Sequence, residues 1–260
     1  MSNYPIRIGV SITPQHGTVD TMRQRWREVE ALGVDSLWTW DHFYPLSGDP
    51  GGTHFECFTL LAAMAMETSR VTIGPLVSCN SYRNPNLVAD MARTIDHLSG
   101  GRFILGLGSG WNERDYEEYG YDFKTAPARL QDLKANMPVI EDRMGKLTPG
   151  PVNGKLPILI GGNGEQVTLR ITARYADLWN GGGTPEEVAR LNGVLDERCA
   201  EIGRNPAEIE RTMNLSAGEE DLADAYVEAG MTHLIVEPSG PDWDLSIAEK
   251  LIRWRDSRRG

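Results

Sequence analysis

Residue types that can do chemistry follow apolar, strand-like segments of this sequence. Asp41 and His42 come directly after residues 36–40, and a polar segment, residues 80–83, follows the apolar residues 71–78. Imidazole exchanges protons near neutral pH, so His42 is a candidate general acid or base, with a structural role as the alternative. Active sites of parallel α/β proteins lie where strands end, and the spacing therefore predicts that these groups meet at one site.

Two glycine-rich segments also follow predicted strands. In Gly161-Gly162-Asn163-Gly164, glycines let successive backbone N–H groups turn toward an anion at the start of a helix, which predicts a phosphate cradle. A glycine-rich turn without a ligand is the alternative. The segment at residues 106–110 does not fit the dinucleotide fingerprint, because that pattern needs a small residue where Trp111 stands.

The cysteines and the other histidines give weaker signals. Cys79 lies at a strand end as either a nucleophile or a small pocket-lining residue, and the second interpretation is favoured because the sequence places no His or Asp to activate it. His54-x-Glu56 is similar to part of a zinc-deaminase pattern but lacks its P-C-x-x-C partner, so no metal site is predicted. Four tryptophans near strand ends suit stacking on a planar ring: Trp38, Trp40, Trp111 and Trp179. Core packing explains Trp38 equally well.

Strand and helix patterns alternate along the chain. Residues 6–12 alternate in hydrophobicity as a strand does, and residues 19–32 carry apolar side chains at helical spacing. Gly33 is typical of a helix C-cap, Asn84-Pro85 of a helix start, and Thr184 of a capping box. Further strands are predicted at residues 36–40, 71–78, 102–107, 158–160, 178–179, 209–215 and 233–236. Further helices are predicted at residues 56–68, 84–98, 112–144, 165–175, 184–202, 219–229 and 246–255.

These eight strand–helix pairs predict a parallel sheet that closes into a (β/α)8 barrel of the TIM type. A doubly wound open sheet is the alternative. The strand ends that would form the mouth of a barrel include residues 11–14, 180–183 and 237–239. In the helix at residues 84–98, one face is expected to point inward through Leu87, Met91, Ile95 and Leu98.

Composition narrows the class of protein. The chain has 260 residues, is 40% hydrophobic and carries a net charge of -11, so we expect one domain over residues 1–260 and no nucleic-acid partner. Three widely spaced cysteines support neither a disulfide framework nor a zinc ribbon, which indicates the cytoplasm. The longest apolar run, residues 58–66, is about half of what spans a bilayer, so no membrane segment is predicted.

Four motifs together resemble the bacterial luciferase-like superfamily and, within it, the oxidoreductases that use the deazaflavin coenzyme F420. The resemblance covers about residues 6–180 in order and spacing. The motifs are Trp40-Asp41-His42-Phe43, Cys79-Asn80-Ser81-Tyr82-Arg83-Asn84-Pro85, Ser99-Gly100-Gly101-Arg102-Phe103-Ile104-Leu105-Gly106-Leu107-Gly108-Ser109-Gly110-Trp111 and Ile160-Gly161-Gly162-Asn163-Gly164-Glu165.

The resemblance implies a barrel with the cofactor ring at its carboxyl-terminal mouth, small-molecule substrates and a homodimer. It implies a non-proline cis peptide around residues 76–78, a bulge on which the ring rests, and it puts Asp41 and His42 beside the reactive centre. The residues implied to hold the ring and its chain are Leu76, Val77, Ser78, Cys79, Asn80, Tyr82, Gly108, Gly110 and Trp111. Those implied to meet the phosphate are Gly161, Gly162, Gly164 and Gln166.

The expected activity is hydride transfer between coenzyme F420 and a small organic substrate, with His42 as proton donor or acceptor and Asp41 orienting it. Sugar phosphates are disfavoured, because the family's sugar-phosphate dehydrogenases carry tryptophan at Leu46 and an acidic residue at Trp111. An FMN-dependent monooxygenase has the same motifs and is the alternative. A non-catalytic barrel that binds a flavin is a third hypothesis.

Overall fold

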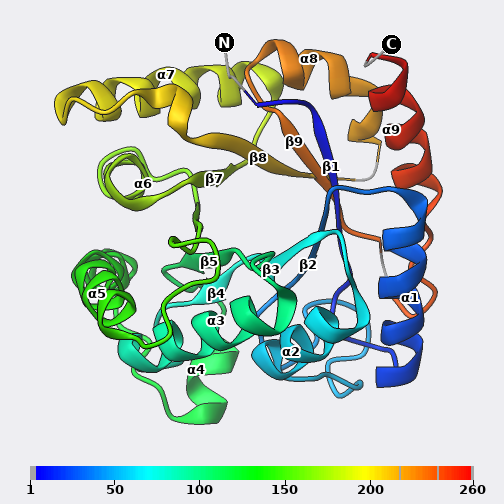
Figure 1. The fold of residues 1–260 in the computed structure, drawn as a ribbon, viewed down its shortest axis with the longest axis horizontal. Coiled ribbons are helices and arrows are strands. Elements are labelled where there is room, and N and C mark those ends of the chain that lie inside the picture. The colour runs from blue at the N-terminus through cyan, green and yellow to red at the C-terminus, as the bar shows by residue number, and fades with distance from the viewer. Residues whose placement is uncertain (1–3, 217, 239, 259–260) are drawn as a thin grey trace.

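Strands and helices alternate along the chain in the computed structural model, which describes residues 4–216, 218–238 and 240–258 (Figure 1). Ser239, one of the predicted strand-end residues, lies outside the described residues. The strands are β1 (Arg7–Ser11), β2 (Ser36–Thr39), β3 (Thr72–Pro75), β4 (Ser78–Cys79), β5 (Leu105–Gly108), β6 (Ile158–Gly161), β7 (Leu178–Gly181), β8 (Glu210–Leu215) and β9 (His233–Val236). The helices are α1 (Val19–Leu32), α2 (Cys57–Glu67), α3 (Pro85–Ser99), α4 (Glu113–Tyr119), α5 (Ala126–Lys146), α6 (Thr168–Tyr175), α7 (Pro185–Glu201), α8 (Ala223–Glu228) and α9 (Ser246–Ser257), with 3-10 turns at Pro206–Glu208 and Glu219–Leu222.

The strands form one parallel sheet that curls into a nearly closed barrel. Its order is β3-β2-β1-β9-β8-β7-β6-β5-β4, so neighbours in sequence are neighbours in space. The two ends meet where Ile73 of β3 bridges Phe103, which precedes β5. β3 and β4 follow one another at a single strand position of the barrel. The nine strands therefore fill the eight strand positions of a (β/α)8 barrel, as predicted. The sequential order rules out the doubly wound sheet, whose strand order reverses.

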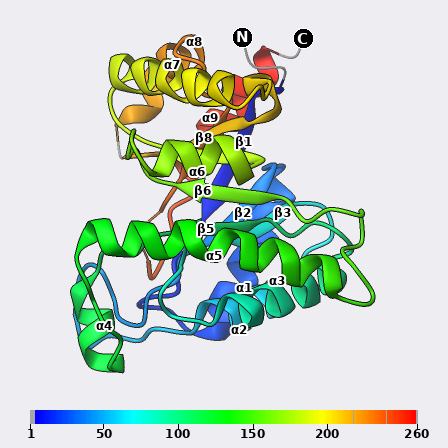
Figure 2. The same ribbon diagram turned by 90° about the vertical axis from the view of Figure 1, so that its left-hand side faces the viewer.

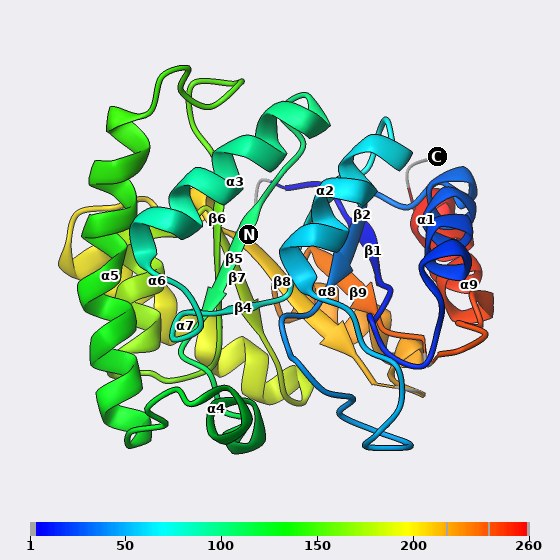
Figure 3. The same cartoon turned by 90° about the horizontal axis from the view of Figure 1, so that it is seen from below.

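The helices surround the sheet on the outside. Figures 1 and 3 show α1 beside α9, so the first and last helices close the ring. Figure 2 shows α5 lying across α3 on another side of the barrel. Of the helices that the structure describes, none is both long and apolar enough to cross a bilayer.

Residues that point into the barrel form distinct zones along its axis. At the amino-terminal end, the polar residues Arg7, Ser36, Glu210 and His233 contact one another. The middle is apolar and is filled by Trp38, Ile104, Leu159, Leu178 and Ile235. The larger hydrophobic cluster lies between the strands and the surrounding helices. Polar residues are thus left for the carboxyl-terminal mouth.

The predicted helix caps are confirmed, whereas two helix predictions need correction. Gly33 caps α1 with φ 93°, Asn84 caps α3, and the Thr184 capping box starts α7. The predicted helix at residues 112–144 is divided into α4 and α5, because Gly120 ends α4 with φ 70°. In α3 the face containing Leu87 and Leu98 points to solvent, with 52% and 43% exposed. Ile95 is buried and Met91 packs against the core, as predicted, and Val88, Ala89 and Ala92 complete the inward face in place of the two leucines.

Candidate active site

A cavity of about 450 Å³ opens at the carboxyl ends of the strands. Most of the predicted site residues line it. Asn80 is buried and does not line it, and Gly164 and Gln166 lie outside it on the exposed turn before α6. The lining residues are Trp40, Asp41, His42, Leu46, Leu76, Val77, Ser78, Cys79, Tyr82, Gly108, Ser109, Gly110, Trp111, Gly161, Gly162, Asn180, Asn214 and Glu237.

One wall of the cavity is a bulge between β3 and β4. The Leu76–Val77 peptide bond is cis, at the position that the resemblance implied. The Val77 side chain projects toward glycines of β5 and β6: a Cβ added at Gly108 would lie 2.7 Å from Val77 Cγ2, and one at Gly161 would lie 3.0 Å from Cγ1. These two glycines therefore make room for Val77. The sequence analysis assigned both glycines to cofactor binding. Their packing against Val77 depends on tertiary contacts and could not be predicted from sequence.

Asp41 holds the bulge in place. Its carboxylate accepts hydrogen bonds from Ser78 Oγ at 2.8 Å and from the Cys79 amide at 3.2 Å. Arg83 donates to both carboxylate oxygens, at 2.6 and 2.9 Å, and also to Glu56 at 2.6 Å. Asp41 is 1% exposed, so this bidentate pair is shielded from water. The end of β2 is thereby tied to the segment that follows β3.

His42 is oriented by Asp115 and not by Asp41, which corrects the predicted pairing. His42 Nδ1 lies 2.6 Å from Asp115 Oδ2, and the Asp115 side chain is fully buried. The Asp115 carboxylate also accepts hydrogen bonds from Tyr82 OH at 2.9 Å, Asn112 Nδ2 at 3.1 Å and the Phe43 amide at 3.1 Å. No spacing rule connects residue 42 with residue 115, and the one available signal is that Asp115, on α4, follows closely after the strand-end residues 108–114.

The charge state of this pair follows from its surroundings. Burial alone would raise the pKa of Asp115, but the hydrogen bonds from His42, Phe43 and Tyr82 outweigh it and lower that pKa. An ionised carboxylate only accepts hydrogen bonds, so Nδ1 of His42 must donate. The free ring nitrogen, Nε2, is then available to accept or hold a proton.

Aromatic rings frame His42. Trp40 and Trp111 both meet its ring edge-on, with centroids at 5.8 and 5.5 Å. Trp40 donates from Nε1 to His54 Nε2 at 3.2 Å, and burial lowers the pKa of His54 to about 4, so His54 is a neutral acceptor. Trp111 is 64% exposed at the rim. Trp38 and Trp179 are fully buried and pack in the core, which corrects the stacking role expected for Trp179.

Cys79 packs against tyrosine. Its Sγ lies 3.1 Å from the hydroxyl of Tyr116, and burial raises the pKa of the thiol. A protonated thiol is a poor nucleophile, which agrees with the favoured interpretation of Cys79 as a pocket-lining residue. Gly110, with φ 80°, passes beside this pair, and a Cβ there would lie 2.5 Å from Cys79 Sγ.

The glycine turn after β6 has a fixed shape. Gly162 has φ 121°, which favours glycine, and a Cβ at Gly164 would lie 2.7 Å from Thr168 Oγ1. The Asn163 side chain donates to the Gly182 carbonyl at 2.7 Å and accepts from the Gly182 amide at 3.1 Å. No side chain of the described residues caps the start of α6, and the Leu169 amide in its first turn donates to the Gly164 carbonyl at 2.9 Å.

Several buried polar atoms near the mouth have no hydrogen-bond partner within the described chain. Asn80 accepts from Asn136 Nδ2 at 3.1 Å through its Oδ1, but its own Nδ2 is unpaired. Leaving such groups unsatisfied costs about 1–3 kcal/mol each, so a ligand or water is expected to meet them. The others at this end of the barrel are Ser11 Oγ, Thr13 Oγ1 and Thr39 Oγ1.

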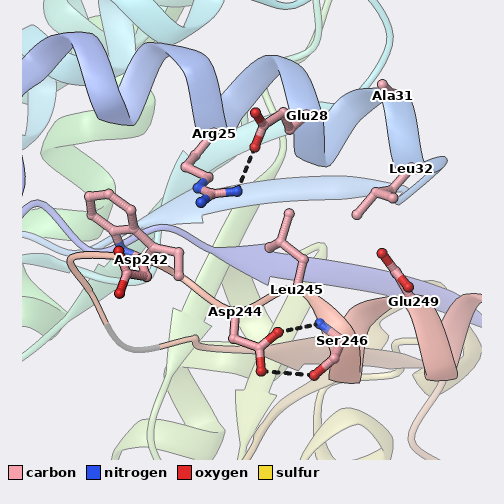
Figure 4. A pocket seen from close by; sticks show the side chains of 10 residues that line it. Arg25, Glu28, Ala31, Leu32, Asp242, Asp244, Leu245, Ser246 and Glu249 are labelled. Carbon is pink, nitrogen blue, oxygen red and sulfur yellow. Dashed lines mark hydrogen bonds and ion pairs between the residues drawn. The ribbon is translucent and has the colours of Figure 1, made fainter.

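A second cavity, of about 710 Å³, lies between α1 and the segment leading into α9 (Figure 4). Its charged groups are satisfied locally: Arg25 pairs with Glu28 at 2.6 Å, and Asp244 accepts from both the amide and the hydroxyl of Ser246 at 2.9 Å. It contains none of the predicted site residues. The strand-end cavity is therefore the candidate active site.

Comparison with known proteins identifies relatives of this chain. A phthiodiolone/phenolphthiodiolone dimycocerosates ketoreductase of Mycobacterium sp. (strain JLS) is 28% identical over 80% of this chain and 64% of its own length. The chain thus spans less than two thirds of that relative. An F420-dependent secondary alcohol dehydrogenase, solved with an F420-acetone adduct, superposes with a TM-score of 0.85 at 16% identity, covering 96% of this chain and 99% of the other.

A coenzyme F420-dependent tetrahydromethanopterin reductase from Methanopyrus kandleri superposes with a TM-score of 0.77, at 16% identity over 95% of this chain and 97% of the other. At such identities the two structures show the shared fold. The sequence model of the luciferase-like monooxygenase family matches residues 2–235. The chain belongs to the luciferase-like monooxygenase family.

Proposed function

We propose that this protein is an oxidoreductase that transfers hydride between coenzyme F420 and a small carbonyl compound or its alcohol. The observation that carries the proposal is the His42–Asp115 pair, which faces the same cavity as the Leu76–Val77 bulge. The names of the relatives support the reaction class, since they include a ketoreductase, an alcohol dehydrogenase and a reductase.

The residues of the cavity fit a flat cofactor with a phosphate-bearing chain. The buried Nδ2 of Asn80, next in sequence to the lining residue Cys79, is unpaired among the described residues, and the glycine turn before α6 is expected to present backbone amides to an anion. We assign the ring and its chain to Leu76, Val77, Ser78, Cys79, Asn80, Tyr82, Gly108, Gly110 and Trp111. We assign the phosphate to Gly161, Gly162, Gly164 and Gln166.

The chain's own groups supply proton transfer and orientation. When bound, the deazaflavin supplies a carbon that gives or accepts hydride and that resists reaction with oxygen. Asp115 holds Nδ1 of His42, so that Nε2 can donate a proton to a developing alkoxide or take one from an alcohol. Asp41 is a positioning residue, because its hydrogen bonds fix the bulge that bears on the ring.

We also propose a homodimer, supported by an apolar stripe on α3. Leu87 and Leu98 lie eleven positions apart, on the same side of this helix, and both are exposed. Met66, at the end of the neighbouring α2, is 69% exposed. Analytical ultracentrifugation is expected to give a dimer for the wild type and a monomer for Leu87→Lys/Leu98→Lys. A monomeric wild type would contradict the proposal.

Titration of the purified protein with F420 and, separately, with FMN tests the cofactor assignment. We expect saturable binding of F420, followed by bleaching of its absorbance when a reactive secondary alcohol is added. Tight FMN binding without F420 binding would favour the monooxygenase alternative. Binding of F420 without hydride exchange across a broad panel of alcohols and ketones would favour the non-catalytic barrel.

A further inference from the structure

The cavity has two chemically different sides. The bulge side is apolar or glycine, formed by Leu76, Val77, Gly108 and Gly161. The opposite side is formed by the ends of β7, β8 and β9, which contribute Asn180, Asn214 and Glu237. The proposed function places the cofactor ring on the bulge side, so the polar side is left for the substrate.

Glu237 points into the barrel because of strand register. Val10 of β1 pairs with Val236 of β9, so the next residues, Ser11 and Glu237, come side by side at the mouth. Gly9 and Ile235 face the interior, where a Cβ at Gly9 would lie 3.0 Å from Ile235 Cγ1. Side chains alternate along a strand, so Ser11 and Glu237, two positions further along, face inward as well.

Glu237 is the carboxylate of the cavity lining that lacks a cationic partner among the described residues. The other lining carboxylate, Asp41, is neutralised by Arg83. No lysine or arginine is among the residues that line the cavity. Glu237 is exposed at the mouth of the cavity, so an entering substrate can reach its carboxyl group. An anionic group brought to this side of the cavity would meet a carboxyl and no compensating cation.

Asn214 lines the same side of the cavity and adds a hydrogen-bond donor there. Asn180 donates from Nδ2 to Thr212 Oγ1 at 3.0 Å and to Asn214 Oδ1 at 3.3 Å. The amide of Asn214 is thereby oriented, and its Nδ2 makes no hydrogen bond to any described residue. A carboxylate that accepts and an amide that donates match a hydroxyl group, which does both.

We propose that Glu237 and Asn214 form a specificity site for an uncharged, hydroxyl-bearing substrate and that Glu237 excludes anionic substrates. The assignment of this side to substrate rests on the proposed function. The preference for hydroxyl over carboxylate rests on the lining itself. This preference concerns the end of the substrate that is remote from its carbonyl group. The carbonyl group itself would react at His42.

Two four-carbon ketones that differ at one end test the proposal: 4-hydroxy-2-butanone, which is neutral, and acetoacetate, which is anionic. Their dissociation constants are measured by ligand-observed NMR on the wild-type protein, with and without F420. We expect the hydroxyketone to bind at least about 10-fold more tightly than acetoacetate. Comparable affinities, or binding of neither ketone, would overturn the proposal.

Variants identify the residue responsible. Glu237→Gln keeps the shape and removes the charge, so the ratio of affinities is expected to fall to about 3-fold or less, whereas Glu237→Asp should keep the rejection of acetoacetate. Asp242→Asn is the matched control, because it removes one exposed carboxylate outside the cavity (Figure 4) and should leave the ratio unchanged. Circular dichroism confirms that each variant is folded.

An unchanged ratio in Glu237→Gln would refute the role of Glu237. The affinities measured without cofactor do not depend on F420. Failure of the specificity proposal can therefore be distinguished from failure of the proposed function. The latter would appear as absence of F420 binding to the wild type.

Discussion

His42 Nδ1 lies 2.6 Å from Asp115 Oδ2, and this contact joins the end of β2 to α4 across 73 positions of sequence. The Asp115 carboxylate is fully buried and accepts hydrogen bonds from three further donors, so it is held in one orientation. A fixed carboxylate behind an imidazole sets the tautomer and the orientation of the ring. The arrangement gives His42 a defined role in proton transfer.

Asp115→Asn is expected to lower kcat/KM about 10-fold to 100-fold, equivalent to about 1.4–2.8 kcal/mol of transition-state stabilisation. The amide keeps the shape but cannot stabilise an imidazolium, and its NH₂ group can oppose the Nδ1 proton. Steady-state kinetics should show the loss in kcat, with F420 affinity unchanged. A variant with wild-type kcat would mean that Asp115 has only a structural role.

His42→Gln and His42→Ala extend this test to the proton-transfer group itself. General acid–base catalysis contributes about 100-fold to 10,000-fold, so both variants should lose activity on that scale. Adding Asp115→Asn to His42→Gln should cost little more, because the two residues act as one unit. Wild-type rates for both His42 variants across the pH range would exclude His42 from the mechanism.

Gly108→Ala is expected to destabilise the protein by about 1–3 kcal/mol, because the added Cβ would lie 2.7 Å from Val77 Cγ2. Val77→Ala should recover part of this loss in the double variant, since it removes the opposing methyl groups. Urea unfolding of the four proteins gives the coupling energy. Gly182→Ala is the control, because a Cβ there meets nothing within 4 Å. Strictly additive effects of Gly108→Ala and Val77→Ala would contradict direct contact.

Stability is expected to fall as the pH drops below about 6.5, in part because of His233 at the amino-terminal end of the barrel. This side chain is fully buried, its Nε2 lies 2.7 Å from Ser36 Oγ, and burial lowers its pKa against the opposing effect of Glu210. Below the pKa of the unfolded chain, the unfolded state takes up a proton that the folded state does not. The stabilisation that His233 contributes to the folded state is therefore complete above about pH 6.5 and is lost as the pH falls.

Chemical denaturation between pH 5 and pH 8 measures this dependence. His233→Gln should reduce the slope of unfolding free energy against pH, although His54, whose pKa is also lowered, will keep part of it. His97→Gln, at an exposed position of α3, should leave the slope unchanged. Equal slopes for His233→Gln and the wild type would show that His233 does not contribute.

Much of the fold could be predicted from sequence because its signals are local. Helix caps such as Gly33 and Asn84, and the alternation of strand and helix patterns, depend on residues close together in the chain. The inward face of α3 was predicted correctly at Met91 and Ile95 but wrongly at Leu87 and Leu98, because two stripes compete at helical spacing. The stripe with Ala89 and Ala92 packs inward, since small side chains let the helix lie close to its neighbours.

The site could be predicted only in outline. Strand ends located Asp41 and His42, and the resemblance located the cis bond at Leu76–Val77. The partners of these residues depend on tertiary contacts. Asp115 reaches His42 through the fold of α4, and Gly108 and Val77 meet only because β5 lies beside the bulge. Neither pairing has a spacing that sequence alone could reveal.

Hydride transfer measured in the presence of F420, with and without oxygen, tests the central claim most directly. The protein is mixed with F420 and a panel of secondary alcohols and ketones, and deazaflavin absorbance and oxygen uptake are recorded together. The account predicts substrate-dependent change in F420 absorbance at the same rate in air and under nitrogen, with no oxygen consumed. Turnover that requires FMN and consumes oxygen, without any change in F420, would contradict it.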